Sequence, residues 1–135
     1  MADRDAIAEL FSAYGAANDL RDAGLIGECF TADGAFTLHI AGADSLGPLA
    51  PRDALLEFFG AAFAAQSDQR RHVVTNLRLV EDGSDGARAE AYLTLIVTDG
   101  AATALKSAGR YETVVVREAG GWRFREMVLH LDSPF

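Results

Sequence analysis

The sequence predicts an α+β fold, in which a curved antiparallel sheet packs against three helices from the first half of the chain. Apolar residues recur at helical spacing in three segments before residue 67, and from residue 70 onward they recur at every second position. Asp and Gly residues separate the later segments and are typical of hairpin turns. Consecutive strands are therefore expected to pair with one another.

The first helix is expected over residues 3–19, with Asp3 as its N-cap. A shorter helix follows, with an apolar side that includes Cys29 as a small buried residue. The pair Asp33-Gly34 predicts a turn before a strand at 35–40. Residues 41–51 are rich in small residues and predict a loop. Pro51 at its end suits the start of a third helix over 52–66. Four strands are expected after it, over 70–80, 87–98, 105–117 and 121–131.

The size and composition of the chain indicate one domain, residues 1–135. Half of the residues are hydrophobic and 24% are charged, which is typical of a globular protein. The net charge of −8 disfavours nucleic acid and anionic membranes as partners, because both require a basic surface. A single cysteine and the lack of a signal pattern or membrane-spanning run lead us to expect a cytoplasmic protein without a disulfide framework.

The alternation of residues sorts each strand into two faces. In strand 87–98 one face is uniformly apolar. In strand 121–131 the face that carries Trp122 and Phe124 is predicted to include two ionisable groups, which is unusual for a plain core. The residues assigned to the rest of that face are Glu126, Val128 and His130.

Strand 70–80 raises a sharper question, because His72 and Asn76 are assigned to one face with Arg78. This face could meet water while the opposite face packs on the helices. Alternatively, His72 could lie deep in a pocket that opens toward Arg78. Periodicity alone leaves both interpretations open, although buried polar residues are the less common case.

The element order resembles the SnoaL-like family of the nuclear-transport-factor-2-like superfamily, cone-shaped α+β domains with one pocket between sheet and helices. Two motifs carry the resemblance. His72-Val73-Val74-Thr75-Asn76-Leu77-Arg78-Leu79 is similar to the strand that bears the catalytic histidine of hexachlorocyclohexane dehydrochlorinase. The segment from Leu10-Phe11-Ser12 through Asp19 is similar to its first helix, which ends in the aspartate that pairs with that histidine. Scytalone dehydratase is the other member to which the chain is most similar; both are lyases without a cofactor.

The resemblance implies that Asp19 lies in hydrogen-bond reach of His72, with His72 as a general base and Asp19 orienting it. It implies a lyase or isomerase that needs no cofactor or metal and acts on a small apolar cyclic or polycyclic substrate. An imidazole that ordinarily titrates near pH 6.5 suits proton removal at neutral pH. Loss of a leaving group from the neighbouring carbon gives an alkene, whereas return of the proton elsewhere gives an isomer.

The leaving-group side of the pocket departs from the family pattern. The position of a basic residue in the dehydrochlorinase corresponds to Glu126, and a position expected to hold tyrosine is Leu38. Dehydration or isomerisation is therefore favoured over halide loss. The candidate acids and further polar pocket residues are Glu126, His130, Tyr111 and Asn76. The expected apolar pocket residues are Tyr14, Phe36, Leu38, Phe58, Phe59, Phe63, Leu93, Leu95 and Val128.

Two further expectations come from the family. A non-catalytic alternative is a small-molecule-binding module, or a structural subunit resembling the small subunit of ring-hydroxylating dioxygenases. Relatives also form homodimers or homotrimers through the convex face of the sheet. The apolar residues expected on that face are Tyr92, Ile96, Val114, Val116 and Met127.

Overall fold

The computed structural model describes residues 2–134 and contains three helices and six strands. The helices are α1 (Arg4–Asp19), α2 (Ala23–Cys29) and α3 (Arg52–Ala65). The strands are β1 (Phe30–Ile40), β2 (Leu46–Leu49), β3 (Gln69–Asp82), β4 (Gly86–Asp99), β5 (Ala102–Glu118) and β6 (Gly121–Leu131). The predicted order is confirmed, with one addition: β2 lies in the segment expected to be a loop. Asp33 and Gly34, expected in a turn, lie within β1.

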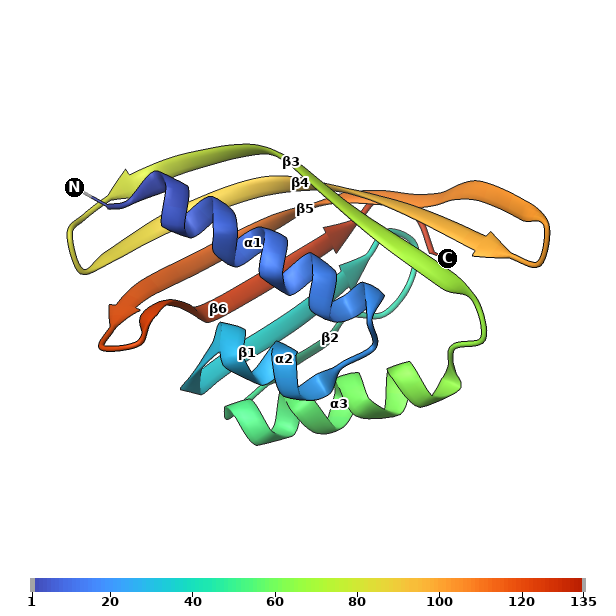
Figure 1. Cartoon of the computed structure of the whole chain (residues 1–135), viewed down its shortest axis with the longest axis horizontal. Helices are drawn as coiled ribbons and strands as arrows, with labels where there is room; N and C mark the ends of the chain where they lie inside the picture. Colours follow the sequence, from blue (N-terminus) through green and yellow to red (C-terminus); the bar gives the residue numbers. More distant parts are fainter. Residues whose placement is uncertain (1, 135) are drawn as a thin grey trace.

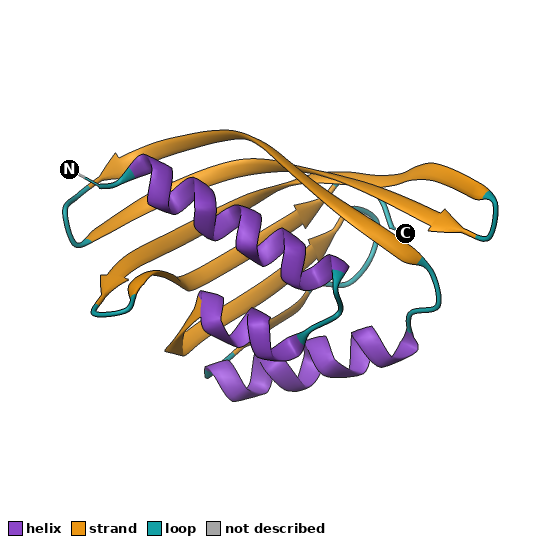
Figure 2. Cartoon of the chain, in the orientation of Figure 1, coloured by secondary structure: helices purple, strands orange, loops and turns teal. Residues whose placement is uncertain are grey.

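The six strands form one open, curved sheet in the order β2-β1-β6-β5-β4-β3. The neighbours β1 and β6 run parallel, and all other neighbours run antiparallel. The helices gather on the side toward which the sheet curves (Figures 1 and 2). The predicted α+β fold with a curved sheet is thus confirmed, although the sheet is mixed rather than wholly antiparallel, because β1 and β6 run parallel.

Helix α1 forms because its apolar residues recur at helical spacing and its first turn is capped. The Asp3 carboxylate accepts a hydrogen bond from the Ala6 amide, as the N-cap assignment predicted. The apolar side of α1 is buried and includes Tyr14 at its centre. The Tyr14 ring lies between 5.8 and 6.2 Å, centroid to centroid, from four aromatic neighbours. These neighbours are Phe30, Phe59, Tyr111 and Phe124.

Helix α2 buries Cys29, as expected. Burial raises the pKa of the Cys29 thiol to about 11, so this side chain stays uncharged at neutral pH. It behaves as a small apolar residue of the core rather than as a reactive group.

Strand β3 contains a bulge at Asn76, whose φ of 58° lies in the left-handed region. The pairing with β4 shifts by one residue directly after Thr75. Beyond the shift, Leu77 and Leu79 pack against the core on the side that His72 faces. Asn76 itself is exposed. The prediction that it shares a pocket face with His72 is therefore wrong.

Strand β6 contains a second bulge, at Arg125, which has no pairing partner on β5. The extra residue reverses the alternation, so that Met127, Leu129 and Leu131 are buried after it. The residues that consequently face outward are Glu126, Val128 and His130. Their assignment to the pocket is wrong for this reason. Met127, expected on the oligomer surface, is fully buried, and that expectation is wrong as well.

Candidate functional site

A cavity of about 100 Å³ lies between the sheet and helices α1 and α3. It is lined by eight of the nine apolar residues predicted for it and by Tyr111. Those eight are Tyr14, Phe36, Leu38, Phe58, Phe59, Phe63, Leu93 and Leu95. Val128 does not line the cavity, because the bulge at Arg125 turns it to the opposite face of the sheet.

Six residues that line the cavity were not predicted: Asn18, Ala62, Gln66, Arg70, Leu129 and Leu131. The sequence pattern could have indicated two of them. Arg70 lies two positions before His72 on the same face of the strand, and Asn18 lies one helical turn after Tyr14. Strict alternation assigned Leu129 and Leu131 to the opposite face of β6, because it does not account for the bulge at Arg125. Gln66 ends the helix expected over 52–66 and lies seven positions after Phe59, on the same helical face, but a polar residue at a helix end is more typical of an exposed position.

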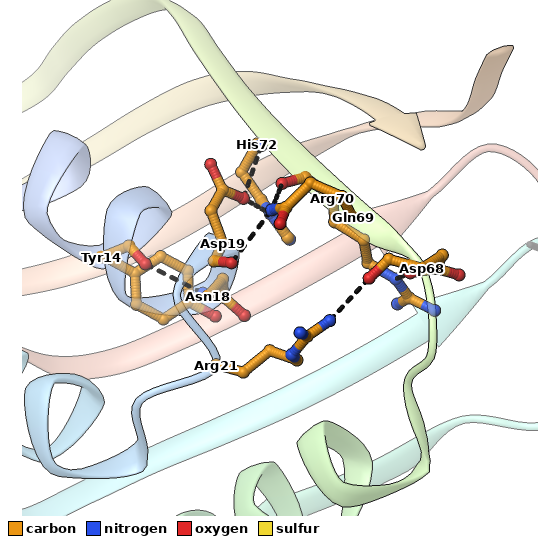
Figure 3. Close-up of polar contacts among 8 residues, drawn as sticks. All are labelled: Tyr14, Asn18, Asp19, Arg21, Asp68, Gln69, Arg70 and His72. Carbon is orange, nitrogen blue, oxygen red and sulfur yellow. Dashed lines mark hydrogen bonds and ion pairs between the residues drawn. The ribbon is translucent and has the colours of Figure 1, made fainter. Parts of the chain in front are cut away.

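Asp19 and His72 are brought together at the cavity wall, although 53 residues separate them in sequence. Asp19 ends α1, and its Oδ1 lies 2.7 Å from Nδ1 of His72 (Figure 3). The same oxygen accepts a hydrogen bond from the His72 backbone amide at 2.9 Å. Because Asp19 occupies Nδ1, Nε2 is the ring nitrogen that remains to act on a molecule in the cavity.

Several contacts hold the end of α1 against β3. The Gln69 amide donates to the Asp19 carbonyl at 3.2 Å, and the Arg21 guanidinium donates to the Asp68 carbonyl at 2.6 Å (Figure 3). The helix also packs closely on this strand at Gly15, where a Cβ would lie in ordinary van der Waals contact, 3.4 Å from the His72 carbonyl oxygen. The backbone on both sides of the Asp19–His72 contact is thereby fixed.

Two phenols, Tyr14 and Tyr111, line the cavity beside this pair. Burial raises the pKa of Tyr14 far above its ordinary value, although the Asn18 side chain acts in the opposite direction. Burial also raises the pKa of Tyr111, with further increases from Tyr14 and from the Asp19 charge. Both hydroxyl groups therefore remain protonated at neutral pH and can donate hydrogen bonds into the cavity.

His130 lies on the outer face of the sheet, where its ring stacks on that of His39 at 5.1 Å. Nε2 of His130 lies 2.7 Å from Oε1 of Glu112, and Arg110 Nη1 lies 2.6 Å from the same oxygen. Burial favours a higher pKa for Glu112, but the hydrogen bond and charge of Arg110, with His130, lower it below 4.5. Of the three predicted acids, only Tyr111 lines the cavity.

Within residues 2–134, no three side chains of His, Cys, Asp or Glu are grouped so that they could hold a metal ion. Over the same part of the chain, no helix combines the length and apolar character that crossing a membrane requires.

Residues 1–128 match the family model of the SnoaL-like domain. The chain belongs to the SnoaL-like family. The predicted family is thereby confirmed, and the match covers nearly all of the sequence. No curated protein matches the chain.

Solved structures similar to this SnoaL-like domain support the same fold. A proposed aromatic ring hydroxylase from Novosphingobium aromaticivorans is 28% identical, with a TM-score of 0.79 over 98% of this chain and 90% of that one. The β subunit of a proposed aromatic-ring-hydroxylating dioxygenase from the same organism is 19% identical, with a TM-score of 0.84 over the same shares. A protein from Catenulispora acidiphila, solved in complex with S-DNPA, is 22% identical, with a TM-score of 0.79 over 94% of this chain and 91% of that one.

Proposed function

We propose that this protein is a cofactor-independent lyase or isomerase that acts on a small, largely apolar cyclic compound. His72 acts as the general base, and Asp19 orients it. The observation that supports this is the 2.7 Å contact between Asp19 Oδ1 and His72 Nδ1 at the wall of an aromatic-lined cavity. A carboxylate on one imidazole nitrogen fixes the tautomer and favours the protonated ring that forms during proton abstraction.

The reaction begins when Nε2 of His72 takes a proton from a carbon atom of the substrate. The electron pair left on that carbon forms a double bond and expels a leaving group from the neighbouring carbon, which is a lyase reaction. If the proton returns to a different carbon, the same base acts as an isomerase. Apolar walls strengthen the attraction between the Asp19 carboxylate and the imidazolium, because little water screens the two charges.

Tyr111 and Tyr14 supply the electrophilic side of the proposed reaction. Both phenols stay protonated and both line the cavity, so either can donate to a substrate oxygen that gains negative charge. This role replaces the one assigned to Glu126 and His130 in the sequence-based hypothesis.

A probe of base catalysis tests the proposal without knowledge of the natural substrate. 5-Nitrobenzisoxazole opens when a base removes its ring C–H proton; the N–O bond then breaks to give a coloured cyanophenolate. We expect the wild-type protein to accelerate this reaction and His72→Ala to lose roughly 100-fold or more of the acceleration. His39→Ala is the matched control on the outer face and keeps full activity. A wild-type rate equal to that of His72→Ala would contradict the proposal.

A non-catalytic role is the second candidate, and the similarity to the β subunit of a proposed aromatic-ring-hydroxylating dioxygenase motivates it. In this case the domain binds a small molecule or serves as a structural subunit, and His72 has no chemical task. Isothermal titration with a bound compound separates the two candidates. A binding module keeps its ligand unchanged over time, whereas an enzyme converts it and loses conversion in His72→Ala.

We also propose that the protein forms a homodimer or homotrimer through the outer face of the sheet. Four of the five residues predicted for this surface do face outward, and Tyr92 is 55% exposed. These four are Tyr92, Ile96, Val114 and Val116. Light scattering after size exclusion should give a multiple of the 14.4 kDa chain for the wild type and the chain mass for Tyr92→Glu. A monomeric wild type would contradict this proposal.

A further inference from the structure

Gln66 lines the cavity, and its side chain carries a buried oxygen that no described residue satisfies. Its side-chain Oε1 is buried and has no hydrogen-bond partner among residues 2–134. The residue lines the cavity and directly follows α3, where its backbone amide donates to the Phe63 carbonyl at 3.2 Å. Buried carbonyl oxygens are nearly always paired in proteins, so an unpaired one in a pocket indicates a place for a ligand donor.

The surroundings of Gln66 indicate which kind of donor fits. The same cavity is lined by Arg70, whose Nε lies 3.0 Å from Oδ1 of Asp68. A positively charged side chain at the wall disfavours a cationic ligand such as an ammonium group. Most other wall residues are aromatic or aliphatic and suit a ring. A neutral hydroxyl group on a ring fits these surroundings. The hydroxyl donates one hydrogen bond to the Gln66 oxygen without a positive charge, and the ring contacts the apolar wall.

The size of the cavity limits the ring system that it encloses. Its volume of about 100 Å³ is somewhat smaller than the roughly 150 Å³ of an engineered protein cavity that binds benzene. One six-membered ring therefore fills the enclosed part, and further atoms of a larger compound extend toward the mouth.

We infer that the ligand of this cavity is a cyclic compound bearing a neutral hydroxyl group, of the phenol or enol class, whose O–H donates to Gln66 Oε1. The inference rests on the proposed function only in placing the ligand beside His72. Gln66 acts as a specificity-determining residue: compounds that present the donor satisfy its carbonyl, and compounds without it leave that carbonyl buried and unpaired.

Three probes of similar shape test the inference. Phenol presents a hydroxyl donor, anisole presents an ether oxygen that only accepts, and toluene presents neither. Their dissociation constants are measured by ligand-observed NMR for wild type, Gln66→Met and Gln66→Glu. Methionine keeps the length of the side chain and removes the acceptor, whereas glutamate keeps an acceptor oxygen in either protonation state.

We expect Gln66→Met to weaken phenol binding by roughly tenfold, the usual effect of losing one such hydrogen bond, with toluene and anisole nearly unchanged. Gln66→Glu should retain the wild-type preference for phenol. An equal change for phenol and toluene in Gln66→Met, or no change for either, would overturn the inference.

The outcome for Gln66 is separable from the outcome for His72. If wild type binds phenol preferentially but fails to open 5-nitrobenzisoxazole, the proposed catalytic function fails and the hydroxyl subsite stands. If the benzisoxazole reaction depends on His72 while phenol and toluene respond equally to Gln66→Met, the catalytic proposal stands and the subsite fails. Binding of none of the three probes to wild type contradicts the inference directly.

Discussion

Residues 2–134 contain two histidine–carboxylate pairs with the same contact distance and different surroundings. Asp19 and His72 join a helix to a strand at 2.7 Å, and Glu112 and His130 join two neighbouring strands at 2.7 Å. The side chains of the first pair are 16% and 13% exposed, and those of the second are 36% and 29% exposed. Only the first pair reaches the cavity, through His72.

In the proposed function only the first pair supplies a catalytic base, although both contacts are equally short. In the second pair, Arg110 and His130 contact the same oxygen of Glu112. The Arg110 guanidinium therefore compensates much of the negative charge of the Glu112 carboxylate. This carboxylate also lies on the outer face, where water screens the interaction. Oδ1 of Asp19 instead accepts from both the ring and the backbone amide of His72. This arrangement fixes the imidazole in one orientation at an apolar wall.

The largest expected effect is the loss of base catalysis when His72 is replaced. His72→Ala should reduce kcat/KM for the benzisoxazole probe by roughly 100- to 10,000-fold, because a positioned general base contributes that much. His130→Ala is the matched variant of the outer pair and should leave kcat/KM unchanged. Steady-state kinetics on both variants checks the comparison, and equal losses would remove the distinction between the two pairs.

The second largest effect is expected when the carboxylate beside each histidine is replaced by an amide. Asp19→Asn should lower kcat by roughly 10- to 100-fold, because the neutral amide no longer stabilises the protonated imidazole. Glu112→Gln, the same change in the outer pair, should have no effect on kcat. A larger loss in Glu112→Gln than in Asp19→Asn would reverse the assignment of the two pairs.

A smaller effect is expected at the bulge that follows His72 in β3. Asn76 has a φ of 58°, which asparagine tolerates and β-branched residues do not. Asn76→Val should therefore destabilise the protein by about 1–2 kcal/mol, whereas Asn76→Gly should be close to neutral. Urea unfolding measures both. Equal stability of the valine and glycine variants would show that the bulge does not require this conformation.

The smallest expected effect is a pH dependence of the outer pair. The pKa of Glu112 is lower in the folded protein than its ordinary value of 4.5, so its carboxylate stabilises the fold above that pH. The stabilisation is lost as the pH falls through the lower, folded-state pKa. The Tm difference between wild type and Glu112→Gln should thus be present at neutral pH and shrink in acid below 4.5. A difference that grows on acidification would contradict this sign.

The alternation rule predicted β4 well and failed in β3 and β6 for one physical reason. The apolar face of β4 is buried throughout, as its sequence indicates. In β3 and β6 a bulge adds one residue and exchanges the faces from that point onward. The signals were present but ambiguous: an asparagine that tolerates positive φ in one strand, and the adjacent charged residues Arg125 and Glu126 in the other.

The candidate site could also be predicted only in part from the sequence. Helical and strand spacing gave most of the apolar wall, since Tyr14, Phe59 and Leu93 lie on regular elements. The contact between Asp19 and His72 came from family resemblance, because spacing along the chain cannot bring together residues 53 positions apart. Gln66 was within the predicted helix 52–66, but its place at the cavity wall depends on α3 ending at Ala65, and helical periodicity does not fix that end.

The protonation of the two His72 ring nitrogens decides whether Asp19 orients His72 as a base toward the cavity. Nitrogen-15 chemical shifts distinguish a protonated ring nitrogen from one with a free lone pair. We expect neutral His72 to carry its proton on Nδ1, toward Asp19, and phenol in the cavity to shift the Nε2 resonance of His72 but not that of His130. A proton on Nε2 of neutral His72, with no response to phenol, would contradict this expectation.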